Sequence, residues 1–100
     1  MGFNLYSPLD TSINAGCRLT VYTDIQLTIP QGYFGKIETH LQMASGGIIV
    51  LGGIVDCKFR GNIGVTLMNL CNETVYINRS DLIGQLIMLP LIQMKINVKK

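Results

Sequence analysis

Apolar and polar residues alternate along several short stretches of the chain, which is the pattern of half-buried strands. The clearest stretch is residues 18–30, RLTVYTDIQLTIP, in which every second residue from Leu19 to Ile29 is apolar or threonine. Pro30 and Gly32 then favour a turn, because proline fixes φ and glycine accepts a positive φ. Residues 31–41 have the composition of a second strand. We expect these two strands to pair as a hairpin.

The rest of the chain consists of short strand-like runs separated by glycine-rich turns. They are GGIIVLGGIV (46–55), NIGVTLMNL (62–70), ETVYIN (73–78) and LIGQLIMLPLIQMKINV (82–98). Residues 82–91 favour a strand over a helix, since they are rich in Ile and Leu and include Pro90. No segment has the pattern of a long helix. The sequence therefore predicts one all-β domain, residues 1–100, with a sandwich or barrel architecture.

Composition and charge narrow the classes of partner. The chain has 100 residues, of which 48% are hydrophobic and 14% charged, so a monomer would expose much apolar surface and we expect an oligomer. Its formal charge is +2 and the basic residues are scattered, which argues against a nucleic-acid partner. No apolar run reaches the ~20 residues of a membrane helix. Three cysteines without a leader indicate free thiols, and hence a soluble intracellular protein of the cytoplasm or nucleus.

Residues 52–64, GGIVDCKFRGNIG, carry the candidate chemistry. A strand leads to Asp56, Phe59 follows, and Gly61 permits the chain to reverse, which predicts a hairpin with an acid and a ring near its tip. Such a hairpin can receive a flat base through backbone hydrogen bonds while Phe59 stacks on a sugar and Asp56 polarises a water molecule. The structural alternative is a surface turn with an Asx hydrogen bond and a core phenylalanine. From these residues alone the structural alternative is the stronger.

Four segments in order change that balance. They are GFNLYSP (2–8), IPQGYFGKI (29–37), GGIVDCKFRGNIGV (52–65) and SDLIGQLIMLPL (80–91). In order and spacing they resemble the first motif, the strand leading into the second motif, the third motif and the fourth motif of the trimeric dUTPase family, especially its retroviral-type members. The third motif is the most specific of the four, and the resemblance covers residues 2–92. It is compatible with a viral or retroelement origin.

The resemblance implies a fold, an assembly and a reaction. The fold is a dUTPase-like jelly-roll or β-barrel subunit, and the assembly is a homotrimer with its sites between subunits. The reaction is hydrolysis of dUTP to dUMP and pyrophosphate with Mg²⁺. By matching position, Asp56 is the water-activating acid, and the substrate-binding residues are Gly53, Ile54, Phe59, Gly61 and Gln85.

Several matched positions depart from the family. Asn4 replaces the acid of the first motif, so no metal ligand is predicted there. His40–Gln42 stand in and beside the places of a phosphate-binding cation and serine, and Ser80 and Leu82 replace the glycine and basic residue of the fourth motif. The glycine-rich fifth motif has no counterpart. Charge-assisted hydrogen bonds to phosphate contribute roughly 1.5–3 kcal/mol each, so losing several should weaken catalysis by orders of magnitude.

Two functions remain open at this point, besides that of a purely structural oligomer fragment. The first is a dUTPase-fold protein that is catalytically inactive or strongly impaired, in which Asp56 is vestigial, and which binds a protein partner through its trimeric surface. It would need no cofactor and would bind dUTP and deoxyuridine weakly or not at all. The alternative is an active dUTP diphosphatase that uses Mg²⁺. Residues 86–92 are expected to form part of the subunit contact because they are apolar.

Overall fold

A computed structural model describes residues 2–92 of the chain. Within this range the chain forms nine strands and one short helix. In chain order they are β1 (Gly2–Tyr6), β2 (Thr11–Ile13), β3 (Arg18–Tyr22), β4 (Tyr33–Glu38), α1 (Leu41–Ser45), β5 (Ile48–Leu51), β6 (Ile54–Val55), β7 (Gly64–Asn69), β8 (Val75–Ile77) and β9 (Leu82–Pro90). The all-β prediction is confirmed, since the helix spans five residues.

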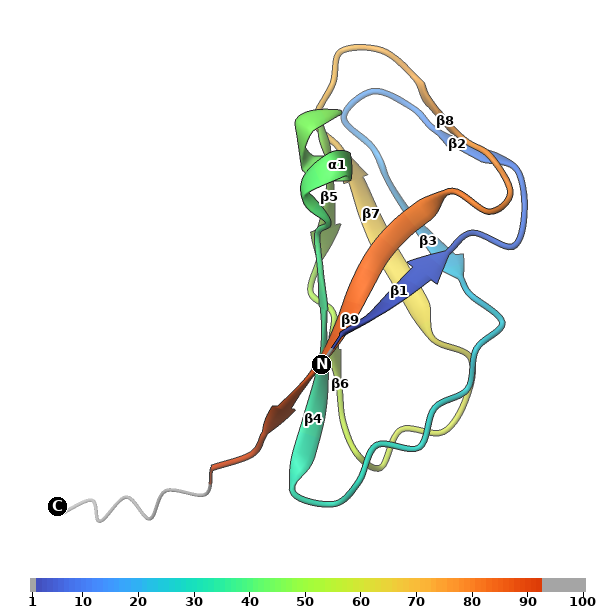
Figure 1. Cartoon of the computed structure of the whole chain (residues 1–100). Coiled ribbons are helices and arrows are strands. Elements are labelled where there is room, and N and C mark those ends of the chain that lie inside the picture. The colour runs from blue at the N-terminus through green and yellow to red at the C-terminus, as the bar shows by residue number, and fades with distance from the viewer. Residues whose placement is uncertain (1, 93–100) are drawn as a thin grey trace, which may run out of the picture.

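The strands form two main sheets and a short ribbon (Figure 1). The larger sheet has the order β1-β9-β4-β6, and the smaller has the order β3-β7-β5. Strands β2 and β8 pair by themselves at one end of the molecule. The long apolar run at residues 82–90 is the strand β9, which lies between β1 and β4.

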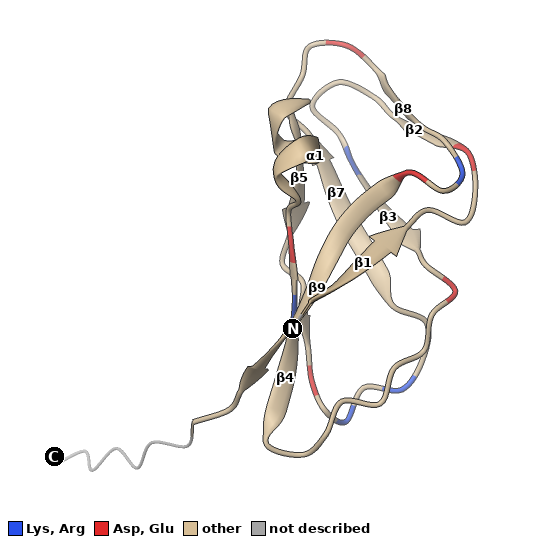
Figure 2. Cartoon of the chain, viewed as in Figure 1, with Lys and Arg blue, Asp and Glu red and all other residues tan. Residues whose placement is uncertain are grey.

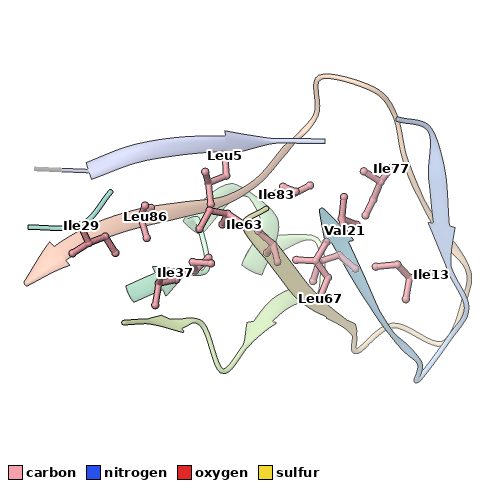
Figure 3. Close-up of a cluster of buried hydrophobic side chains, with 13 residues drawn as sticks. Leu5, Ile13, Val21, Ile29, Ile37, Ile63, Leu67, Ile77, Ile83 and Leu86 are labelled. Carbon is pink, nitrogen blue, oxygen red and sulfur yellow. The ribbon is translucent and has the colours of Figure 1, made fainter. Parts of the chain in front are cut away.

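The hydrophobic core lies where these three β units face one another (Figure 3). Strand alternation places one set of side chains inside, because successive residues of a strand point to opposite faces. The larger sheet contributes Leu5, Ile37, Val55, Ile83 and Leu86, the smaller sheet contributes Val21, Ile48, Val65 and Leu67, and the ribbon contributes Ile13 and Ile77. Each fully buried Leu or Ile stabilises the fold by roughly 1.5–3 kcal/mol relative to exposure.

The strand predicted for residues 18–30 is too long. It ends at Tyr22, and Asp24 then takes a left-handed φ of 63°, which a strand does not accommodate. The inward alternation nevertheless continues through residue 29, because Ile29 is buried and both Ile25 and Leu27 pack against the core. The alternation of apolar residues therefore predicts burial correctly as far as Ile29, although the strand ends at Tyr22.

Both predicted hairpins are wrong. A turn does occur after Pro30, with the Tyr33 amide donating to the Pro30 carbonyl at 3.1 Å, but β3 pairs with β7 whereas β4 pairs with β9 and β6. Likewise, β6 and β7 belong to different sheets. Residues 56–63, which we name the 56–63 loop, cross from one sheet to the other. The reason is burial, since Val55 and Val65 fill one core from opposite sheets.

Residues 86–92, which we expect at the subunit contact, differ in burial within one chain. The Leu86 side chain is 0% exposed and belongs to the core of a single chain, whereas Leu91 is 53% exposed.

The prediction of free thiols is confirmed for Cys17, Cys57 and Cys71. Over residues 2–92, none of the helical structure is long and apolar enough to cross a membrane.

Candidate functional site

Asp56 begins the 56–63 loop, directly after the edge strand β6. Its carboxylate Oδ1 accepts a hydrogen bond from the Lys58 backbone amide at 2.9 Å, and the Phe59 amide donates to the Asp56 carbonyl at 3.0 Å. This is the Asx-type turn of the structural alternative. The hydrogen bond from the Lys58 amide is the main cause that lowers the pKa of the exposed Asp56 carboxyl below its usual value, and a contact with Cys57 is the second cause. Asp56 is therefore an ionised carboxylate at neutral pH.

A pocket of about 330 Å³ lies beside this loop, between it and the outer face of the smaller sheet. It brings together three of the predicted substrate residues, Gly53, Ile54 and Phe59. The Phe59 side chain is 39% exposed, so the structural alternative of a core phenylalanine is wrong. Asp56 does not line this pocket, but it lies beside Ile54 in an adjoining hollow of about 290 Å³. The acid and the accessible ring therefore line two hollows that share Ile54.

The segment after β3 holds the 56–63 loop in place, and Figure 1 shows the two running side by side. The Thr23 amide and hydroxyl both donate to the Ile63 carbonyl at 2.8 Å, and the Ile63 amide donates to the Ile25 carbonyl at 2.9 Å. Asp24 and Asn62 add two further hydrogen bonds between the segments. The loop is therefore fixed by pairing with a distant part of the chain, and sequence reasoning did not identify Asn62.

The two predicted glycines have structural roles. Gly53 has a φ of +95°, and a Cβ placed on it would lie 2.6 Å from the Ile37 carbonyl oxygen, which no side chain tolerates. This close approach accompanies a 2.7 Å hydrogen bond from the Ile37 amide to the Gly53 carbonyl. Gly61 has a φ of +137°, which favours glycine, but it lies in a loop that crosses between sheets and not in the predicted hairpin turn, and it does not line the pocket.

Gln85 lies away from the other predicted residues. On β9 it is paired with Asn4 of β1 on one side and with Glu38 of β4 on the other. Asp56 follows Val55, which pairs with Gly35, three positions along β4 from Glu38. A single chain therefore does not bring Gln85 to the Asp56 pocket.

The segment expected to replace the phosphate-binding motif forms α1. His40 is the N-cap of this helix, and its Nδ1 accepts a hydrogen bond from the Gln42 amide at 3.2 Å. Gln42 also lines a pocket of about 320 Å³ together with Asp81 and Leu82 of the fourth motif. The second and fourth motifs therefore meet at this pocket, at the end of the molecule that holds α1 (Figure 1).

Charged residues do not gather into one face. Figure 2 shows Lys and Arg separated along the chain and interspersed with Asp and Glu. Within residues 2–92 the salt bridge is Lys36 Nζ to Glu38 Oε1, at 3.6 Å and partly exposed, so it contributes little to stability. This distribution matches the scattered charge expected from the sequence.

Comparison with known proteins identifies the family. The family model described as dUTPase matches residues 1–100. The chain belongs to the dUTPase family. The deoxyuridine 5'-triphosphate nucleotidohydrolases of Variola virus and of Vaccinia virus (strain Copenhagen) are each 40% identical to it over 86 residues. That match covers 86% of this chain and 58% of each relative, so the chain spans less than two thirds of these viral proteins.

Solved dUTPase structures share the fold. The native EIAV dUTPase superposes with a TM-score of 0.90 at 26% identity, covering 99% of this chain and 82% of that one. A point mutant of the dUTPase from phage phi11 of S. aureus, a structure that describes the coordination of a structural Mg(II) ion in that protein, gives 0.89 at 19% identity with the same coverages. The predicted fold class, an all-β dUTPase-like jelly roll, is confirmed.

The family resemblance implies Mg²⁺ in dUTP hydrolysis, and a magnesium site in the chain itself would need carboxylate ligands. Over residues 2–92, no three His, Cys, Asp or Glu side chains gather at one place. Asn4 and Gln85, which pair across the sheet, offer amides rather than carboxylates. Mg²⁺ in phosphate-handling sites is usually held by one or two carboxylates plus the substrate phosphates, so this pair does not fit a metal site.

Proposed function

We propose that this dUTPase-family chain forms part of an enzyme that hydrolyses dUTP to dUMP and pyrophosphate. The observation that carries the proposal is an ionised, exposed Asp56 beside the pocket formed by Gly53, Ile54 and Phe59. The named activity of the poxvirus relatives supports it. Those comparisons give no support to the expectation from the sequence that hydrolysis is lost.

In this proposal the nucleoside occupies the pocket. Backbone groups of the 52–64 segment read the uracil edge, while Phe59 packs under the deoxyribose. Asp56 accepts a proton from a water molecule while the water oxygen attacks the α-phosphorus of dUTP. The bond between the α-phosphorus and the bridging oxygen breaks, and pyrophosphate leaves. Mg²⁺, if brought by the triphosphate itself, would supply neutralisation of phosphate charge.

The chain offers weaker contacts to the phosphates than to the nucleoside. His40 is engaged as a helix cap, and neither Leu41 nor Leu82 can donate a charged hydrogen bond. We therefore propose an enzyme with weakened phosphate binding and a high KM for dUTP. Its affinity for deoxyuridine should be no better than about millimolar, since neutral contacts contribute only a few kcal/mol after association entropy is subtracted.

A homotrimer completes the site in this proposal. Because Gln85 and Asp56 lie at different places in one chain, a substrate that contacts both requires a second copy. Mixing Asp56→Asn with Gln85→Ala chains tests this arrangement. If sites are shared, mixed assemblies regain part of the activity that each variant lacks. Light scattering that returns a stable monomer at micromolar concentration contradicts it.

Pyrophosphate release from dUTP with Mg²⁺ tests the reaction itself. Asp56→Asn should abolish release, whereas Glu73→Gln, the same change of an exposed acid after β7, should leave it unchanged. Release by the wild type that equals release by Asp56→Asn would contradict the proposed reaction.

A second candidate is a protein that binds a partner through its trimeric surface without hydrolysis. One observation favours it, because α1 exposes Leu41 where the family resemblance expects a phosphate-binding serine. Under this candidate, deoxyuridine still shifts the amides of residues 52–64 but dUTP yields no pyrophosphate. That pair of results distinguishes it from the enzyme.

A further inference from the structure

The pocket beside the 56–63 loop has a second wall that the motif residues do not supply. This wall is the outer face of the smaller sheet. Tyr22 of β3 pairs with Gly64 of β7, and Thr20 pairs with Thr66, so these four residues share one face. The opposite face of the same strands carries Val21 and Val65 into the core.

Tyr22 is the large side chain of this wall. Its side chain is 57% exposed although it lines the same pocket as Phe59. The Tyr22 ring lies over Gly64, where a Cβ would approach ring atom Cε1 to 2.9 Å. The absence of a side chain at Gly64 therefore leaves room for the ring, and the ring borders the pocket rather than the core.

We propose that Tyr22 is a second aromatic binding residue for the nucleoside, acting from β3 opposite the motif residues. The inference rests on the proposed function. Two aromatic side chains from separate elements, Tyr22 on the sheet and Phe59 on the loop, border one pocket of about 330 Å³. A pyrimidine ring is planar and stacks on aromatic faces, a contact worth roughly a five- to hundredfold change in affinity per base.

The pocket is suited to a small planar ligand with polar edges. Its floor contains the buried side chains of Ile37, Val55 and Ile63, which exclude water from one side. Near Tyr22, the hydroxyl oxygens of Thr20 and Thr66 lie 2.8 Å apart, so one hydroxyl donates to the other. The hydrogen of the accepting hydroxyl remains free for a ligand. An apolar floor with a few convergent polar groups is typical of small-molecule sites.

The structural alternative is that Tyr22 only covers Gly64. An exposed aromatic side chain over a strand glycine stabilises a sheet through cross-strand contact. The two roles make different predictions for Tyr22→Leu and Tyr22→Phe. Leucine keeps an apolar cover over Gly64 but removes the ring, whereas phenylalanine keeps the ring and removes the hydroxyl.

A deoxyuridine titration followed by amide chemical shifts, with thermal unfolding of each variant, separates them. We expect Tyr22→Leu to raise the deoxyuridine Kd roughly tenfold and Tyr22→Phe to change it by less than about twofold. Tyr76→Ala is the matched control, since Tyr76 is an exposed tyrosine that does not line this pocket.

Each outcome has a defined meaning. Equal affinities for wild type and folded Tyr22→Leu overturn the inference about Tyr22 while leaving the nucleoside pocket in place. If Tyr22→Leu does not fold, a Tyr22 ring that shows no chemical-shift change on titrating the wild type overturns it as well. No shift in residues 52–64 of the wild type at tens of millimolar deoxyuridine overturns both the inference and the proposed nucleoside site.

Discussion

Asp24 and Asn62 hold each other through two hydrogen bonds across a sequence separation of 38 residues. The Asp24 amide donates to Asn62 Oδ1 at 2.8 Å, and Asn62 Nδ2 donates to Asp24 Oδ1 at 3.2 Å. Asp24 adopts a left-handed φ of 63° to do so, a conformation that aspartate tolerates better than most residues. The pair fixes the end of the 56–63 loop beside the pocket.

Asn62→Ala should therefore loosen this loop. We expect a loss of about 1 kcal/mol in the free energy of unfolding, since the bonds are partly exposed. Faster amide hydrogen exchange at Asp24 should accompany it. Asn72→Ala, at an exposed asparagine elsewhere, serves as the control. Unchanged exchange at Asp24 would show that Thr23 and Ile63 hold the loop without the pair.

Gly52 and Gly53 should respond differently to alanine. Both have positive φ, 67° and 95°, but the space around a Gly52 Cβ is open whereas a Gly53 Cβ meets the Ile37 carbonyl. We expect Gly52→Ala to cost about 1 kcal/mol from backbone strain alone. Gly53→Ala should cost several times more, because β6 must move away from β4. Urea unfolding measures both, and equal costs contradict the predicted contact.

Asp56 should titrate below the usual aspartate pKa of about 3.9, because the Lys58 amide favours its charged form. A folded pKa below the unfolded value stabilises the fold above the unfolded pKa, and this stabilisation is lost as pH falls through the folded pKa. Between about pH 5 and pH 8, Asp56→Asn should thus leave the pH dependence of stability unchanged. Carbon-13 titration of the carboxyl gives the midpoint, and a midpoint above about 3.9 contradicts the hydrogen-bond argument.

Leu86 and Leu91 belong to one apolar run, but Leu86 lies in the core and Leu91 lies at the surface. Leu86→Ala should lower the free energy of unfolding by about 2–5 kcal/mol, because it leaves a cavity between the sheets. Leu91→Ala should have little effect on the fold of one chain, since that side chain is 53% exposed. Chemical unfolding at several protein concentrations distinguishes a core effect from a subunit contact. A concentration-dependent loss for Leu91→Ala would assign it to the contact.

The sequence by itself determined the inward positions of the alternating stretch at residues 18–30 and the turn after Pro30. Alternation marked Val21 and Ile29 as inward, and glycine and proline chemistry marked the turn after Pro30. These properties follow from side-chain hydrophobicity and local φ preferences, which act within a few residues. The ordered motifs also indicated the dUTPase family, and with it the fold.

Only the tertiary structure decided which strands pair and which residues share a site. Neighbouring strands such as β3 and β4 joined different sheets, because burying both apolar faces in one core outweighs the shorter loop of a hairpin. The same packing placed Tyr22 and Phe59 around one pocket and separated Gln85 from Asp56. No local pattern encodes these relationships, since each depends on contacts between residues that are far apart in the chain.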